Sequence, residues 1–204
     1  MRNISDRTQS TVEQQMRMLG GFGIDLRVAA PGIIQNVDFE HQTCTVQLAV
    51  RERLNYDGDL QWTDIPVLPD VPFFIYSGGG YCVTLPIQPG DECLVIFGDN
   101  CMDAWWQSGG VQNQVEMRRH DLSDGFAVVG FRSQPNTVSG YSSGTAQIRN
   151  ASGDACIEIS GSTINIRASG GVNISGGTTI DSKNFLGHTH SGVESGGSNT
   201  GGVS

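Results

Sequence analysis

The stretch that decides the fold is residues 155–180, with the sequence ACIEISGSTINIRASGGVNISGGTTI. Isoleucines recur in it as pairs with one residue between them, at Ile157 and Ile159 and again at Ile164 and Ile166. Because alternate side chains of a strand point to the same side, each pair gives a short strand one narrow apolar face. Glycine-containing breaks separate the pairs, so the pattern predicts a series of short strands joined by tight turns.

The surrounding zone, from residue 140 to the C-terminus, has a composition that is typical of disorder when taken alone. Of its 65 residues 26 are Gly or Ser, yet the regular isoleucine pairs indicate order. A strand with one narrow apolar face cannot bury that face alone, and the zone has too few turns for a stable single-chain solenoid. Three chains that share one core bury such faces, so we predict a trimeric intertwined β-helix over residues 140–187.

Two histidines follow the repeat directly. His188 and His190 are two residues apart, so their side chains point to one place in a strand. A threefold axis brings six imidazoles together, and six nitrogen donors suit an octahedral transition metal rather than tetrahedral zinc. Imidazole accommodates Fe, Ni, Co and Cu, and cellular supply together with geometry favours Fe(II). We therefore predict one Fe ion per trimer at an apex in residues 188–204, and expect His41 and His120 to be structural or surface residues.

Residues 28–110 show strand patterns of another kind. Residues 32–37 and 43–50 predict a hairpin, in which Cys44, Val46, Leu48 and Val50 share one buried face.

Further strands are expected at residues 62–68, 81–85 and 91–97. Pro66 places the first of them at a sheet edge, a loop with Asp57 and Gly58 precedes it, and Pro89-Gly90 joins the other two. Five short strands in this length fit a small closed barrel. We predict an OB-fold, with a five-stranded sandwich as the open alternative.

The segments that flank the barrel are less regular. Val12, Met16 and Leu19 fall at helical spacing within residues 5–19, and Gly20-Gly21 is expected to end that helix. Both a surface helix and a helix that docks on a larger partner fit this pattern. After the barrel, residues 111–139 are predicted to form a connector with a short strand at residues 127–131. Trp105 and Trp106 are expected in the core or at a subunit interface.

Charge and composition exclude several classes of protein. The formal net charge is −9, which disfavours a general nucleic-acid binder and electrostatic docking on an anionic membrane. Without a run of 18 apolar residues or an apolar segment near the N-terminus, we expect no transmembrane helix, no signal peptide, and folding in the cytoplasm. Five cysteines with no C-x-x-C spacing predict reduced, mostly buried thiols.

The segment HDLSDGFAVVGF at residues 120–131, the H-x-H pair and the small-residue tail after it carry a resemblance to a known family. The chain resembles the central spike proteins of contractile phage tails and related injection machines, over most of its length. The resemblance implies a homotrimer with iron held at its apex by His188 and His190. It also implies attachment to a baseplate hub protein, mechanical piercing of the host outer membrane, and a place in the virion. The short β-helix departs from larger members of the family, and no lysozyme-like domain is present.

The expected fold is therefore all-β, with a short N-terminal helix, an OB-fold barrel and a trimeric β-helix with a metal-binding apex. We expect no enzyme activity and no nucleic-acid partner. An OB-fold module that binds an oligonucleotide or glycan, with a flexible tail, is the alternative. A metalloenzyme that uses the two histidines with Asp181 or Glu194 is disfavoured, because a needle tip has no pocket. The expected segments are 1–27 (helical docking segment), 28–110 (barrel), 111–139 (connector), 140–187 (β-helix) and 188–204 (apex and tail).

Overall fold

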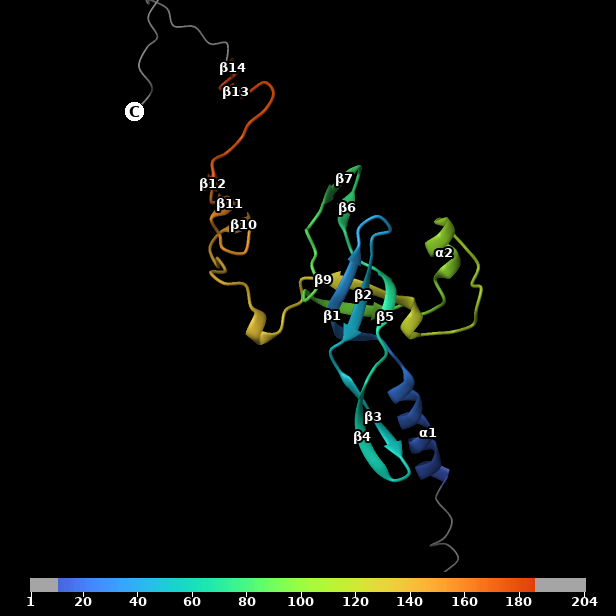
Figure 1. The fold of residues 1–204 in the computed structure, drawn as a ribbon. Coiled ribbons are helices and arrows are strands. Elements are labelled where there is room, and N and C mark those ends of the chain that lie inside the picture. The colour runs from blue at the N-terminus through green and yellow to red at the C-terminus, as the bar shows by residue number, and fades with distance from the viewer. Residues whose placement is uncertain (1–10, 186–204) are drawn as a thin grey trace, which may run out of the picture. The chain divides into compact units, whose positions relative to one another are not determined.

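The structure is a computed structural model, and it describes residues 11–185. The chain divides into two compact units, Met1–Thr137 and Val138–Ser204, and each is described by itself. Figure 1 shows the helices and strands of both units. None of the helices within residues 11–185 is long and apolar enough to cross a bilayer.

The first unit is built on the predicted hairpin. Strands β1 (Ala29–Asp38) and β2 (Thr43–Leu48) pair antiparallel, with Gly32 opposite Leu48 and Asp38 opposite Thr43. Cys44, Val46 and Leu48 are buried, which confirms the alternation, whereas Val50 lies beyond the strand and is exposed.

Five strands form the main sheet of this unit, in the order β5-β2-β1-β8-β9. The three further strands are β5 (Leu68–Pro72), β8 (Glu92–Phe97) and β9 (Gly125–Val129). The two edge strands meet after β5, where Phe73 forms a parallel bridge with Ala127 and the Phe74 amide donates to the Ala127 carbonyl at 2.8 Å. The sheet thus curls into a half-barrel. Its core consists of Ile34, Cys44, Val46, Leu48, Ile65, Leu68, Val71, Ile87, Cys93, Val95, Phe97 and Ala127.

Three expectations about this unit need correction. β9 lies in the segment expected to be a connector, yet it pairs with β8 in the main sheet. The strands on either side of Pro89-Gly90 do not pair with each other: β8 pairs with β1, and β7 (Tyr81–Val83) pairs with β6 (Tyr76–Gly78). The expected helix was wrong at its C-terminal end, because α1 (Thr11–Asp25) continues through the two glycines.

A second hairpin was also missed. Strands β3 (Arg51–Tyr56) and β4 (Asp59–Asp64) pair where we expected a loop followed by a strand through Pro66. Asp57 and Gly58 both have positive φ, at 50° and 98°, as a two-residue hairpin turn requires. No residue of β4 is buried, so this hairpin projects from the half-barrel rather than covering it.

The second unit contains a three-stranded antiparallel sheet in the order β10-β11-β12. The strands are β10 (Ala146–Arg149), β11 (Ala155–Ser160) and β12 (Thr163–Ala168). A two-residue pair follows, β13 (Thr179–Ile180) with β14 (Lys183–Asn184). Gly161, with φ at 56°, turns the chain between β11 and β12, as expected of a glycine in a break between isoleucine pairs. The meander is the structure of one chain, and the intertwined β-helix stays a prediction.

Candidate functional site

The isoleucines of the second unit gather on one face of its sheet. Ile148, Ile157 and Ile166 are aligned across β10, β11 and β12, and Ile159 is opposite Ile164. Aligned residues share a face, so the register places all five side chains together. They are 46–70% exposed, which makes the apolar face the open face of the sheet. We call these five residues the isoleucine face.

The opposite face of this sheet is polar and better covered. The Glu158 carboxylate accepts hydrogen bonds from the Gln147 side-chain amide at 2.5 Å and from Asn165 at 3.3 Å, and the Arg167 guanidinium lies 3.4 Å away. The bond from Gln147, followed by the contacts with Arg167, lowers the pKa of Glu158 below its ordinary value. The buried Cys156 lies on the same side.

This distribution of side chains reverses that of an ordinary half-buried sheet. A one-layer sheet in water normally turns its polar side outward and packs its apolar side on a core. Here the apolar side has no covering element among the described residues, as is typical of surfaces through which proteins associate. Val172 and Ile174 lie outside the strands and are also exposed, so they add apolar surface to the same unit.

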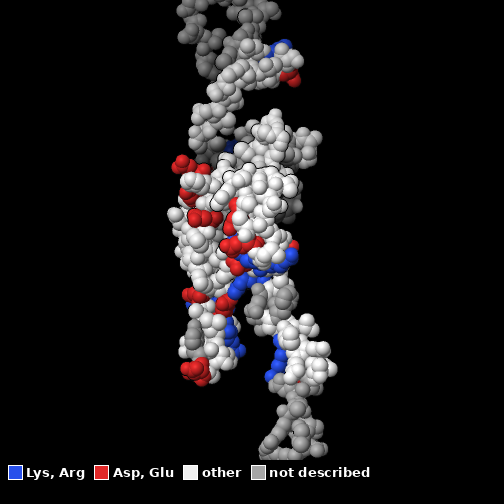
Figure 2. Space-filling model, turned by 90° about the vertical axis from the view of Figure 1, so that its right-hand side faces the viewer, with Lys and Arg blue, Asp and Glu red and all other residues white. Residues whose placement is uncertain are grey.

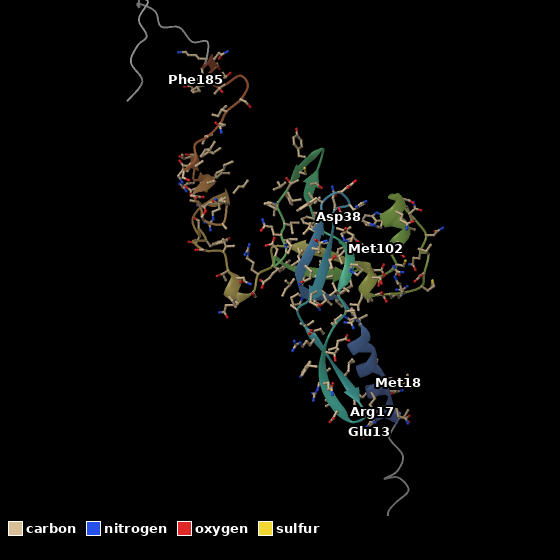
Figure 3. The ribbon with its side chains drawn as sticks, viewed as in Figure 1. Glu13, Arg17, Met18, Asp38, Met102 and Phe185 are labelled. Atoms are coloured by element: carbon tan, nitrogen blue, oxygen red, sulfur yellow. The ribbon has the colours of Figure 1, made fainter. Side chains whose placement is uncertain are left out.

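The predicted metal ligands, His188 and His190, lie outside the described residues, which end at Phe185 (Figure 3). The other two histidines lie in the first unit. His41 is exposed and its Nδ1 lies 2.8 Å from Asp38, while His120 contacts Asp99 at 3.2 Å. Both are paired with surface carboxylates in the part of the chain that the structure describes.

A buried ionic cluster, which sequence reasoning missed, lies at the entrance to β9. Asp124 is fully buried, and its carboxylate accepts from Arg118 at 2.8 and 2.9 Å and from the Met102 backbone amide at 2.9 Å. Arg118 also donates to Asp103 at 2.6 Å and to Glu116 at 2.9 Å. Arg118 thereby lowers the pKa of Asp103, and the carboxylates around it raise the pKa of Arg118.

The same cluster contains the one group of potential metal ligands found among residues 11–185, formed by Cys101, Asp103 and Asp124. Their ligand atoms lie within 4.8 Å of one another. The Arg118 guanidinium already bonds to both carboxylates. Arg118 therefore supplies the positive charge that a metal cation would otherwise bring to them. The cluster therefore fits a structural role: it fixes the segment between α2 (Asp103–Ser108) and β9.

Trp105 and Trp106 of α2 lie beside this cluster and are both partly exposed, at 45% and 41%. The Trp105 ring packs on Phe126 of β9, with ring centroids 5.9 Å apart. The tryptophans therefore cover the half-barrel from outside rather than entering its core.

The cysteines follow the expectation from sequence. All five are free thiols, and four of them are buried, with Cys82 the exposed one. Burial raises the pKa of Cys44 to about 12 and that of Cys93 to about 11. Both groups therefore remain neutral thiols inside the barrel.

The C-terminal end of the first unit is fastened to the sheet by Glu92. The Glu92 carboxylate, on β8, accepts from the Ser133 amide at 2.5 Å, the Ser133 hydroxyl at 2.6 Å and the Asn136 side chain at 2.7 Å. These bonds lower the pKa of Glu92, with those from Ser133 contributing most. The segment after β9 is thus held to the neighbouring strand.

A cavity of about 400 Å³ opens at one end of the half-barrel, where β6 and β7 leave it. Phe39, Phe73, Phe74, Leu85 and Ile87 are among its lining residues, and no charged side chain lines it. An oligonucleotide requires cationic groups for its phosphates, so this cavity does not fit the nucleic-acid alternative.

The fold and these surfaces define a mostly β protein: a half-barrel with its own core, followed by a sheet whose apolar face is exposed among the described residues. Residues 30–130, just under half of the chain, match the family model described as Phage protein Gp138 N-terminal domain. The match spans β1 to β9, so it covers the half-barrel and the Arg118 cluster. No curated protein sequence matches the chain. The similarity indicates a phage structural protein and hence one associated with the virion.

Proposed function

We propose that this chain is the central spike of a contractile phage tail, a homotrimer that pierces the host outer membrane when the tail contracts. The isoleucine face is the observation that carries the proposal. A rod made from three such units turns the faces inward to a shared core and leaves the polar faces, with Glu158 and Arg167, in water. The similarity of residues 30–130 to a phage protein domain supports this reading.

The shape of the apolar surface supports threefold association. The face is only three strands wide, and the unit has one buried residue, Cys156, among those described. Full burial of an isoleucine side chain contributes about 1.5–3 kcal/mol. Five isoleucines from each of three chains then give the rod the core that one chain lacks.

We assign the half-barrel to the OB-fold. Its strand order β5-β2-β1-β8-β9, with a parallel bridge that joins the first and last strands, fits a five-stranded partly open Greek-key barrel. The role of this domain in the proposal is structural: it carries the rod and, with residues 1–27, attaches it to the baseplate hub protein. The work is mechanical, and we assign no catalytic residue and no nucleic-acid partner.

The proposed tip holds one Fe ion through His188 and His190 of three chains. This part rests on the spacing of the two histidines and on their position directly after the repeat. An ion that links three chains adds its binding free energy to the stability of the folded trimer. Chain ends otherwise fray, so a link at the tip protects the rod where it is weakest.

Native mass spectrometry combined with metal analysis tests the proposal on the full chain. We expect three chains and one iron per particle in the wild type. The double variant His188→Ala with His190→Ala is expected to lose the iron, whereas the control His41→Ala, at an exposed loop residue, retains it. A monomeric wild type would overturn the spike assignment. Unchanged iron in the double variant would overturn the ligand assignment.

A further inference from the structure

The helix α1 carries an apolar stripe that is left exposed by the described residues of its own chain. Val12, Met16 and Leu19 follow one another at intervals of four and three residues, and Gly23 continues the series at an interval of four. The three side chains are 61–68% exposed. We call Val12, Met16, Leu19 and Gly23 the α1 stripe.

The nearest element is the β3–β4 hairpin, which leaves the same end of the half-barrel (Figures 1 and 2). An ion pair between Arg27 and Glu52 joins the chain just after α1 to this hairpin. Beyond that point Figure 2 shows the helix and the hairpin as two separate projections. The hairpin therefore does not cover the α1 stripe.

The composition of α1 makes it weak as an isolated helix. It contains Gly20, Gly21 and Gly23, and each glycine in a helix interior costs about 1 kcal/mol relative to alanine. Isolated helices of about 12–15 residues are marginal in water even when rich in alanine. None of the three glycines has an atom within 4 Å of the position of a Cβ, so packing in this chain does not require them. Packing against another molecule would stabilise a helix of this composition.

The spacing of the α1 stripe indicates what that molecule is. Intervals of four, three and four residues are those of the a and d positions of a coiled coil. The partner that fits this spacing is another helix. The charged residues of α1 are Glu13, Arg17 and Asp25, a net charge of −1, so several copies can approach without strong repulsion.

We infer that the α1 helices of three copies pack against one another along the α1 stripe as a parallel three-helix bundle. The inference rests on the proposed trimer, because a threefold axis relates the helices by rotation and makes them run in the same direction. Association through the isoleucine face holds three α1 helices in one particle, which raises their effective concentration. A hub protein then contacts the outer, polar side of the bundle, which carries Arg17.

Two methionines offer a matched test. Met16 and Met18 are two residues apart in α1 and similarly exposed in one chain, at 67% and 76%, but only Met16 lies on the α1 stripe. At about 100° per residue, the Met18 side chain points about 160° away from that of Met16 around the helix. Figure 3 labels Met18 and Arg17 on the helix.

Hydrogen–deuterium exchange of the full-length protein, with native mass spectrometry on the same samples, separates the outcomes. We expect slow exchange of the α1 amides in the wild type and in Met18→Glu. We expect exchange at least tenfold faster in Met16→Glu, with three chains still present because the isoleucine face is intact. A trimeric wild type whose α1 exchanges without protection would overturn the bundle alone, as would equal effects of the two variants. A monomeric wild type would overturn the bundle together with the proposed function.

Cross-linking provides a second readout that does not depend on a destabilising charge. In a Cys82→Ser background, which removes the exposed thiol, Leu19→Cys is expected to form interchain disulfides under mild oxidation and Met18→Cys is not. Equal cross-linking at the two positions would contradict the assigned stripe.

Discussion

The two units of this chain solve the problem of burying apolar residues in opposite ways. The half-barrel encloses a core of twelve residues, centred on Val46 and Val95, within one chain. In the second unit Cys156 is the buried residue among those described, and the isoleucines lie outside. The first unit therefore owes its stability to contacts within the chain. In the proposed trimer the second unit is stabilised by association, so its stability is expected to depend on protein concentration.

The largest expected effect tests the second unit. Ile157→Asp places a carboxylate on the isoleucine face, where an unpaired charge in an apolar core costs several kcal/mol or more. We expect the trimer to dissociate in native mass spectrometry while the tryptophan fluorescence of the first unit, which contains Trp62, Trp105 and Trp106, stays native.

Ser160→Asp is the control for this variant, because it adds the same charge to the opposite face of the same strand. An Ile157→Asp protein that keeps the wild-type mass would show that the face is not an interface.

The next effect tests the first unit. Arg118→Met removes the ionic partner of the fully buried Asp124, and the loss of one member of a buried pair costs about 3–5 kcal/mol. Urea unfolding followed by tryptophan fluorescence measures this loss in free energy of unfolding. The matched variant Arg119→Met, at an exposed position, should change it by less than about 0.5 kcal/mol. Equal changes in the free energy of unfolding for the two variants would show that the Arg118 cluster does not stabilise the half-barrel.

A smaller effect concerns the packing of the barrel. A Cβ at Gly32 would lie 2.5 Å from Val46 Cγ1 and 3.2 Å from the Cys93 sulfur. Gly32→Ala should therefore cost about 1–3 kcal/mol, as overpacking of a core does. Gly78→Ala, in β6, meets no atom within 4 Å and is the control in the same unfolding experiment. If Gly32→Ala left the free energy of unfolding unchanged, β1 and β2 would have to move apart at little cost. The core at this position would then not be tightly packed.

The smallest effect is on pH dependence in the second unit. The lowered pKa of Glu158 means that its bonds to Gln147 and Arg167 stabilise the fold above the ordinary glutamate pKa. This stabilisation is lost as pH falls through the lowered value. The protection factors of the β11 amides, which correct for the pH dependence of the intrinsic exchange rate, should therefore fall on acidification in the wild type. Glu158→Gln should show a weaker dependence, and an unchanged profile would assign the acid response to other groups.

Much of the fold was predictable where one face of a strand is buried. The alternation of Cys44, Val46 and Leu48 located β2, and the isoleucine spacing located β11 and β12, because burial or shared exposure leaves a period of two in the sequence. The β3–β4 hairpin left no such period, since neither of its faces packs on a core. The Asp57-Gly58 turn is the sequence signal that could have predicted this hairpin.

Other features of the fold could not be predicted from local sequence patterns. β8 pairs with β1 rather than with the preceding strand because that register buries Cys93 and Val95. The α1 helix passes Gly20 and Gly21 because glycine weakens a helix without forbidding it. The bond between Arg118 and Asp124 joins residues on either side of a turn, and no spacing rule distinguishes this arginine from its neighbour Arg119.

The Glu92 carboxylate has a mechanical consequence. The chain leaves the half-barrel from β9, which has a ladder with β8 on one side and the bridge to Phe73 on the other, so a force on Thr137 acts first on this edge strand. Three bonds from Ser133 and Asn136 to Glu92 divert that force into β8, which is flanked by β1 and β9. A load on the segment after β9 therefore reaches two ladders, that of β8 with β1 and that of β8 with β9, rather than the ladder of β9 alone.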